Sequence, residues 1–182
     1  MSMATAKTGT FHLTETVRMD ANQVNGTRNQ GSIDLGAYVN VATGQALSIT
    51  NVSWIIQRDS DFGSELSAFC VGNSGISFQV SDLNPGTAFV RADDSSLIAS
   101  GSLNIDFVNN VGTQMSDLYP DRFGSSGAFH VVNDSLYVVV GNDGNDVGTG
   151  HLYVTVNLTC KIVKLSNKDF VAIAIQSTSS DN

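Results

Sequence analysis

Basic residues and glutamate are scarce in this sequence, whereas aspartate is common. The chain of 182 residues has nine Lys and Arg against 17 Asp and Glu, a formal net charge of -8, and its only glutamates are Glu15 and Glu65. Such a chain is not attracted to phosphate backbones or anionic lipid, so we expect no strong direct binding to nucleic acid. Because aspartate favours turns over helix interiors, the same bias predicts strands and loops.

Charged residues of both signs are few. They make up 14% of the chain, hydrophobic residues make up 41%, and the mean hydropathy is +0.03. A chain of this length can bury a core without covalent staples, so much of its surface must be uncharged Ser, Thr, Asn and Gly. Interface cores are depleted in charge. The composition therefore fits a protein that hides surface against copies of itself, and it fits equally a secreted β domain with a neutral polar coat.

Long apolar runs and cysteines are also lacking. No stretch of about 18 continuous apolar residues could span a bilayer, and the start, MSMATAKTGTFHL, has no apolar run that could serve as a signal peptide. We therefore expect no transmembrane segment. The two cysteines, Cys70 and Cys160, each lie among apolar residues, which favours buried thiols over a disulfide.

Helical periodicity is almost absent, and a period of two takes its place. In HLYVTVNLTCKIVKL, residues 151–165, apolar and polar side chains alternate, which predicts a long strand with one wet face. Residues 10–19 and 32–41 alternate in the same way. In residues 45–57 the apolar positions change phase, which predicts a β-bulge or a corner. Further strands are expected at 66–71, 76–80, 87–91, 103–108, 128–132 and 136–140.

About eight to ten short strands separated by turn-forming segments predict an all-β, antiparallel, jelly-roll-like sandwich. We expect one domain over residues 1–182, with a short flexible N-terminal arm over about 1–9 and a C-terminal tail over about 177–182. The segment just before this tail fits two structures. Ser166 and Asp169 have the spacing of a helix capping box, and residues 170–175 alternate as in a strand. We favour the strand.

The loop GNDGND, residues 141–146, echoes one copy of the glycine-aspartate repeat of calcium-binding β-helices. Asp143 and Asp146 are the candidate metal ligands, and Ca²⁺, which needs six to eight oxygens, is the one candidate cofactor. A hairpin turn between the flanking strands explains the same residues without an ion. We prefer the hairpin.

Catalytic motifs are not evident. CVGNSGIS, residues 70–77, resembles the loop around a protease nucleophile, but His12 is the only histidine upstream of Ser74, and too few residues precede that serine for a first barrel. No phosphate loop, dinucleotide fingerprint or zinc-cysteine pair occurs. We therefore expect no enzyme.

In overall order the chain resembles a viral single jelly-roll capsid protein: a short polar arm, IDLGAYVNV and ALSITNVSWIIQ as early strands, long Gly/Asn/Ser loops, and the late strand LYVTVNLTCKIVKL. The resemblance implies a structural virion protein whose many copies self-assemble into an icosahedral shell, and it leaves open a second capsid protein. The sequence departs from many such proteins because it lacks a basic arm. The genome would then be neutralised by an internal membrane, another basic protein or cations.

The alternative is a non-catalytic β-sandwich module that binds carbohydrate or a receptor, including a spike or decoration protein. Its aromatic platform would come from Tyr38, Tyr119 and Tyr153. For the capsid subunit, we expect contacts from segments whose loop or terminal position exposes them. The predicted contact residues in these segments are Lys7, Phe11, Arg28, Tyr119 and Arg122.

Overall fold

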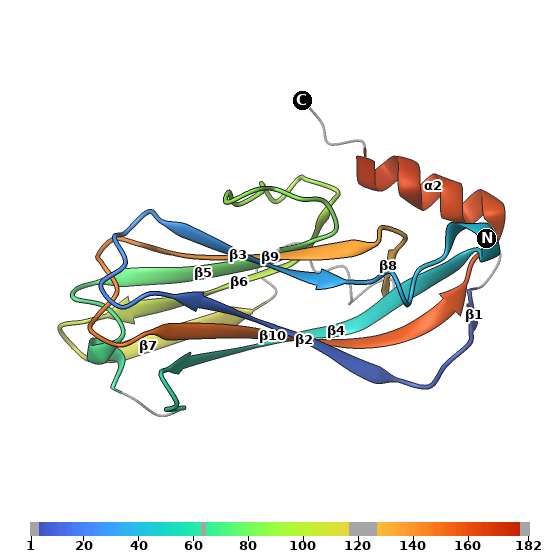
Figure 1. The fold of residues 1–182 in the computed structure, drawn as a ribbon. Helices are drawn as coiled ribbons and strands as arrows, with labels where there is room; N and C mark the ends of the chain where they lie inside the picture. The colour runs from blue at the N-terminus through green and yellow to red at the C-terminus, as the bar shows by residue number, and fades with distance from the viewer. Residues whose placement is uncertain (1–3, 63–64, 117–126, 179–182) are drawn as a thin grey trace.

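Two antiparallel sheets packed face to face make up the computed structural model, which describes residues 4–62, 65–116 and 127–178 (Figure 1). Sheet A contains β1 Thr5–Ala6, β2 Phe11–Met19, β4 Gln45–Arg58, β8 Phe129–Val131 and β10 Leu152–Lys164. Sheet B contains β3 Arg28–Asp34, β5 Ser74–Ser81, β6 Leu97–Asp106, β7 Val111–Ser116 and β9 Ser135–Asp143. The predicted all-β sandwich is confirmed. Outside the sheets lie the 3₁₀ turns η1 Val41–Thr43 and η2 Leu66–Ala68 and the helix α2 Asn167–Thr178.

The strand order is that of a jelly roll. Sheet A runs β2-β10-β4-β8, with β1 pairing farther along the same edge of β10, and sheet B runs β3-β9-β5-β6-β7. Successive strands from β2 to β5 alternate between the sheets, and β9 and β10 return to insert beside the early strands. This is the double Greek key of jelly rolls, so the jelly-roll-like topology is confirmed as well.

The core lies between the sheets, where the alternating patterns place their apolar faces. Trp54 of β4 and Phe78 of β5 meet there with ring centroids 4.6 Å apart. Cys70 and Cys160 are buried free thiols in the same core, as predicted, and burial raises the pKa of Cys160 to about 12. The predicted phase change in β4 is a register shift opposite Thr159 and Cys160.

One open side of the sandwich is closed by side chains of its edge strands. Glu15 points inward from β2, where its carboxylate accepts a hydrogen bond from the backbone N–H of Ser32 in β3. A Cβ at Gly31 would lie 2.6 Å from that carboxylate, so glycine leaves the space for it. Asn29 donates to the carbonyl of Arg18 across the same gap. An inward charge of this kind also protects an edge strand from pairing with other chains.

Three predicted strands are wrong in whole or in part. The strand expected over 32–41 ends at Asp34, whose side chain accepts from the N–H of Gly36 and turns the chain. Residues 66–71 contain the turn η2 instead of a strand. Residues 87–91 form part of a long loop that lies over sheet B (Figure 1). Each short apolar run packs through tertiary contacts that periodicity does not detect.

The predicted C-terminal strand is wrong: residues 167–178 form α2. The capping box decides it, because the N–H of Asp169 donates to Ser166 Oγ at 3.1 Å and that hydroxyl lies 2.7 Å from Asp169 Oδ2. Phe170, Ile173 and Ala174 then fall on one helical face and pack on a small apolar cluster with Ala46, Val132, Val163 and Leu165. The helix also occupies the first two residues of the expected tail.

The hairpin predicted around GNDGND is wrong too. β9 belongs to sheet B and β10 to sheet A, so residues 144–151 connect the two sheets. At the N-terminus, residues 5–8 lie along β10, where the N–H of Lys7 donates to the carbonyl of Ile162. In the part of the chain that the structure describes, no helix is long and apolar enough to cross a membrane.

Candidate functional site

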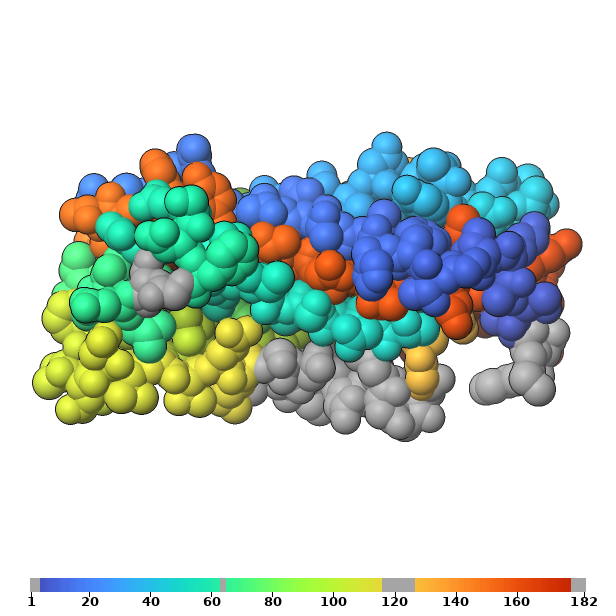
Figure 2. Space-filling view, turned by 90° about the horizontal axis from the view of Figure 1, so that it is seen from below, coloured from blue at the N-terminus to red at the C-terminus, as the bar shows by residue number. Residues whose placement is uncertain are grey.

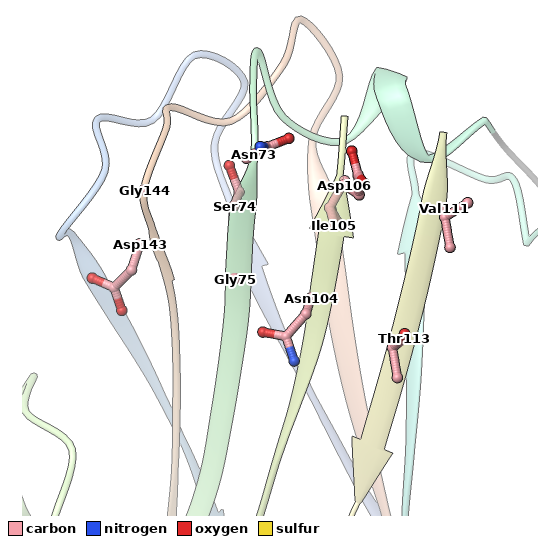
Figure 3. Close-up of a pocket in the computed structure, with 10 residues that line it drawn as sticks. All are labelled: Asn73, Ser74, Gly75, Asn104, Ile105, Asp106, Val111, Thr113, Asp143 and Gly144. Atoms are coloured by element: carbon pink, nitrogen blue, oxygen red, sulfur yellow. The ribbon is translucent and has the colours of Figure 1, made fainter. Parts of the chain in front are cut away.

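A shallow polar trough of about 710 Å³ lies on the outer face of sheet B, near the end where β6 and β9 finish (Figure 3). Its floor is formed by one lateral row of the sheet. Gly75 of β5 pairs with Asp143 of β9 on one side and with Asn104 of β6 on the other, and Asn104 pairs with Thr113 of β7. Because neighbouring strands lie about 4.8 Å apart, the glycine leaves roughly 9.6 Å between the backbones that flank it.

The side chains around this trough offer hydrogen bonds more than charge. Asn104 points toward Gly75, whereas Asp143 points away from it, toward β3 (Figure 3). Asp106 at the rim accepts two hydrogen bonds from Asn109, which hold the pKa of this aspartate below its usual range. The amide of Asn104 and the hydroxyl of Thr113 suit a neutral polar ligand.

Arg28 of β3 binds Asp143, which lines the trough, so two of the predicted site residues are in contact. Its Nη2 lies 2.8 Å from each carboxylate oxygen of Asp143, and its Nη1 donates to the carbonyl of Asn142. Gly141 pairs directly with Arg28, and the missing Cβ lets the guanidinium group lie flat on the sheet. Arg28 was a predicted subunit contact and Asp143 a predicted metal ligand, and in the structure they pair within one chain.

The long β5–β6 connection is fastened over this same face of sheet B. The ring of Phe89 stacks on Arg28, with the guanidinium carbon 4.7 Å from the ring centroid. Gln79 Oε1 accepts from the N–H of Val90 at 2.9 Å, and its Nε2 donates to the carbonyl of the same residue at 3.0 Å. Gln30 donates to Asn84 and Gly86. Residues 84–90 therefore cover β3, β9 and β5 on the outside.

Asp146 and Asp143 are engaged by different partners. Asp146 Oδ1 accepts from the backbone N–H of Asn25 at 2.8 Å and from its amide at 2.9 Å, and these bonds lower the pKa of the carboxyl group. Among the described residues, no three His, Cys, Asp or Glu side chains converge on a common point. Internal hydrogen bonds thus account for both aspartates, and calcium binding at this loop stays a prediction.

The other predicted contact residues do not gather in one place. Lys7 is exposed beside β10, whereas Phe11 is half-buried, packs against the core and stacks on Tyr38 with centroids 5.4 Å apart. Tyr153 lies at the opposite end of sheet A, so it forms no platform with Tyr38. Tyr119 and Arg122 lie outside the described residues.

Among the described residues, no segment covers the outer face of sheet A, and the strands place no carboxylate on it. β2, β10 and β4 lie side by side across it, as the view from below shows (Figure 2). Thr16 pairs with Thr155, which pairs with Ile55, and in another row Thr14, Asn157 and Ser53 pair in the same way. The sheet A strands contain one carboxylate, Glu15, and it points inward. The alternation in the sequence predicted a wet face for β10, but not that β2 and β4 would extend it on both sides.

The chain matches no protein-family model and no curated protein. The proposal below therefore depends on the geometry of the molecule.

Proposed function

We propose that this chain is a structural virion subunit, a capsid protein that assembles in many copies into an icosahedral shell and carries out no catalysis. The observation that supports this most is the strand order β2-β10-β4-β8 facing β3-β9-β5-β6. Jelly rolls of this order build viral shells, although they also occur in lectins and cupins, so topology alone does not decide the function.

The surface chemistry adds support that is independent of the topology. A chain with a net charge of -8 keeps the outer face of sheet A free of carboxylates and lined with short hydroxyl and amide side chains. Burying the rows of Thr, Asn and Ser costs little charge desolvation, because the charged side chains of this face, Arg18 and Lys161, lie outside these rows. Such rows match the composition of interface cores. A subunit that makes several weak contacts at once is then held strongly.

The test is the mass of the purified protein by light scattering over a range of concentrations, with negative-stain microscopy of the same samples. Closed particles or rings of defined symmetry are expected. A monomer at every concentration and salt level would overturn self-assembly by this chain. Repeating the measurement with calcium and with a chelator tests Asp143 and Asp146, since loss of particles on chelation is what a structural ion there predicts.

The polar trough favours a second candidate, a module that binds a neutral, hydroxyl-rich ligand such as a glycan. A glycan array probed with the wild-type protein and with Asn104→Ala tests it. Binding that is lost in Asn104→Ala and kept in Ser53→Ala, on the opposite sheet, would establish this candidate. An array with no signal would remove it.

A further inference from the structure

An exposed aromatic side chain and an apolar cavity lie at opposite ends of this molecule. Phe62 follows β4 and is 73% exposed, although a side chain of this size is usually buried. The cavity, of about 300 Å³, lies between α2 and β8. Its lining residues are Ala4, His130, Leu165, Asp169, Ala172, Ile173 and Gln176.

Phe62 is presented by an ordered turn. Arg58 and Asp61 exchange two backbone hydrogen bonds, of 2.8 and 3.2 Å, which close the chain just before the phenylalanine. Asp59 within this turn has a φ of 49° and is tied to His151 at the start of β10 by hydrogen bonds in both directions. A side chain held out by a fixed backbone loses less entropy on binding than one on a mobile loop.

The cavity beside α2 matches the side chain of Phe62 in size and polarity. Apolar side chains of Ala4, Leu165, Ala172 and Ile173 make up most of its walls, and the ring of His130 and the polar side chains of Asp169 and Gln176 complete them. Burial lowers the pKa of His130, so this ring is neutral at physiological pH and the cavity carries no buried cation. The volume of about 300 Å³ accommodates one phenyl ring. Aromatic side chains that fill such pockets dominate the affinity of protein interfaces.

The charged side chains near Phe62 and those near the cavity are opposite in sign. Asp59, Asp61 and Glu65 surround Phe62 in sequence and are exposed. Near the cavity, Lys164 and Lys168 precede the lining residues Leu165 and Asp169. Both lysines are exposed, and within the described residues neither forms an ion pair. Asp169, the one carboxylate of the lining, already accepts the hydroxyl of Ser166.

The two features cannot meet within one chain. Phe62 follows the last residue of β4, Arg58, whereas the cavity lies beside the end of sheet A where Gln45, the first residue of β4, pairs with Lys164. β4 has 14 residues, so its ends are roughly 40 Å apart. We therefore propose that Phe62 of one copy inserts into the α2 cavity of the next copy, with the carboxylates around Phe62 facing Lys164 and Lys168. This contact is head-to-tail, and such contacts close into rings or continue as filaments.

The proposal rests on the proposed function, because it requires self-association, and two complementary variants separate the two ideas. Phe62→Ala removes the inserting side chain and keeps the cavity. Ala172→Phe fills the cavity and keeps the side chain of Phe62. Each variant alone is expected to associate at least about 30-fold more weakly than the wild type in sedimentation velocity. A mixture of the two retains one intact contact, so it is expected to form a one-to-one dimer and nothing larger.

Val108→Ala, an equally exposed apolar position in the β6–β7 turn, is the matched control and is expected to associate like the wild type. Circular dichroism of each variant confirms that it is folded. Charge provides an independent check: Lys164→Glu with Lys168→Glu, or Asp61→Lys with Glu65→Lys, is expected to weaken association, and all four changes in one chain are expected to restore it. Wild-type behaviour of Phe62→Ala and Ala172→Phe would overturn this contact and leave the proposed function standing, whereas a wild-type protein that never associates would overturn both.

Discussion

The two sheets of this sandwich treat their outer faces differently. The chain covers much of the outer face of sheet B. Val139 in the centre of β9 points outward, yet it is only 1% exposed. Gln30 and Gln79 lie opposite it on the neighbouring strands and hold the β5–β6 connection in place by hydrogen bonds. On sheet A, no part of the chain that the structure describes covers the rows of Thr, Asn and Ser on β2, β10 and β4 (Figure 2). The described residues thus cover one outer face with the chain itself and leave the other exposed.

The largest change in the free energy of unfolding is expected at the contact between Trp54 and Phe78, which joins the two sheets. Phe78→Ala removes the sheet B half of the Trp54 pair and leaves a cavity in the core, which should lower the free energy of unfolding by about 3–5 kcal/mol. Urea denaturation followed by the fluorescence of the single tryptophan measures it. Ile55→Ala, on the bare face of sheet A, is the control and should change the same quantity by less than about 0.5 kcal/mol. A loss below about 1 kcal/mol for Phe78→Ala would contradict a shared core.

A smaller effect should distinguish the covered face from the bare one. Gln79→Ala removes both hydrogen bonds to Val90 and should cost about 1–3 kcal/mol. Hydrogen exchange should accelerate across residues 84–90 and stay unchanged in β10. Thr155→Ala deletes an exposed hydroxyl pair with Thr16 on sheet A and should cost less than about 0.5 kcal/mol. Equal costs for the two variants would show that the β5–β6 connection is not fastened.

The smallest expected effect concerns Glu15, at the side where the sheets meet. Burial raises the pKa of this carboxyl group, and the hydrogen bond from Ser32 offsets part of the rise. Above the ordinary value of 4.5, the folded chain then binds more protons than the unfolded chain, so stability falls as the pH rises through the raised pKa. Glu15→Gln removes this loss. Its melting temperature should exceed that of the wild type at a pH of about 8 and approach it at a pH of about 4.

The exposed Glu65, changed to Gln, is the control for this pH dependence. If the difference between Glu15→Gln and the wild type has the same size at both pH values, proton binding at Glu15 is not its cause.

Much of the fold was predictable because long strands with one buried face keep a strict period of two. β2, β9 and β10 were found in this way, as was the bulge in β4. The helix α2 was missed because residues 170–175 satisfy both periods, and the capping box of Ser166 and Asp169 and the packing of Phe170 on Val163 and Leu165 together favour the helix. β7 was overlooked because its sequence, VGTQMS, has few apolar residues, and this mostly exposed strand forms through pairing with β6.

The candidate site was predictable only residue by residue. Arg28 and Asp143 were both selected, but their pairing follows from β3 lying beside β9, which is a property of topology and not of local sequence. Phe62 was not predicted as a site residue, because a single aromatic residue among aspartates indicates an ordinary turn. Only its exposure in the structure distinguishes it. Gly75 and Gly141 lie in the motifs CVGNSGIS and GNDGND, but only their neighbours across the strands show what the missing side chains make room for.

The pairing of β10 with β2 and β4 also sets the order of events during synthesis. β5, β6 and β7 are neighbours both in the chain and in sheet B, so this meander can form as it leaves the ribosome. β2 and β4 must wait for β10, more than 90 residues after the end of β4, and such distant pairings are slow to form. Sheet A, with its bare face and the α2 cavity at its end, is therefore completed last.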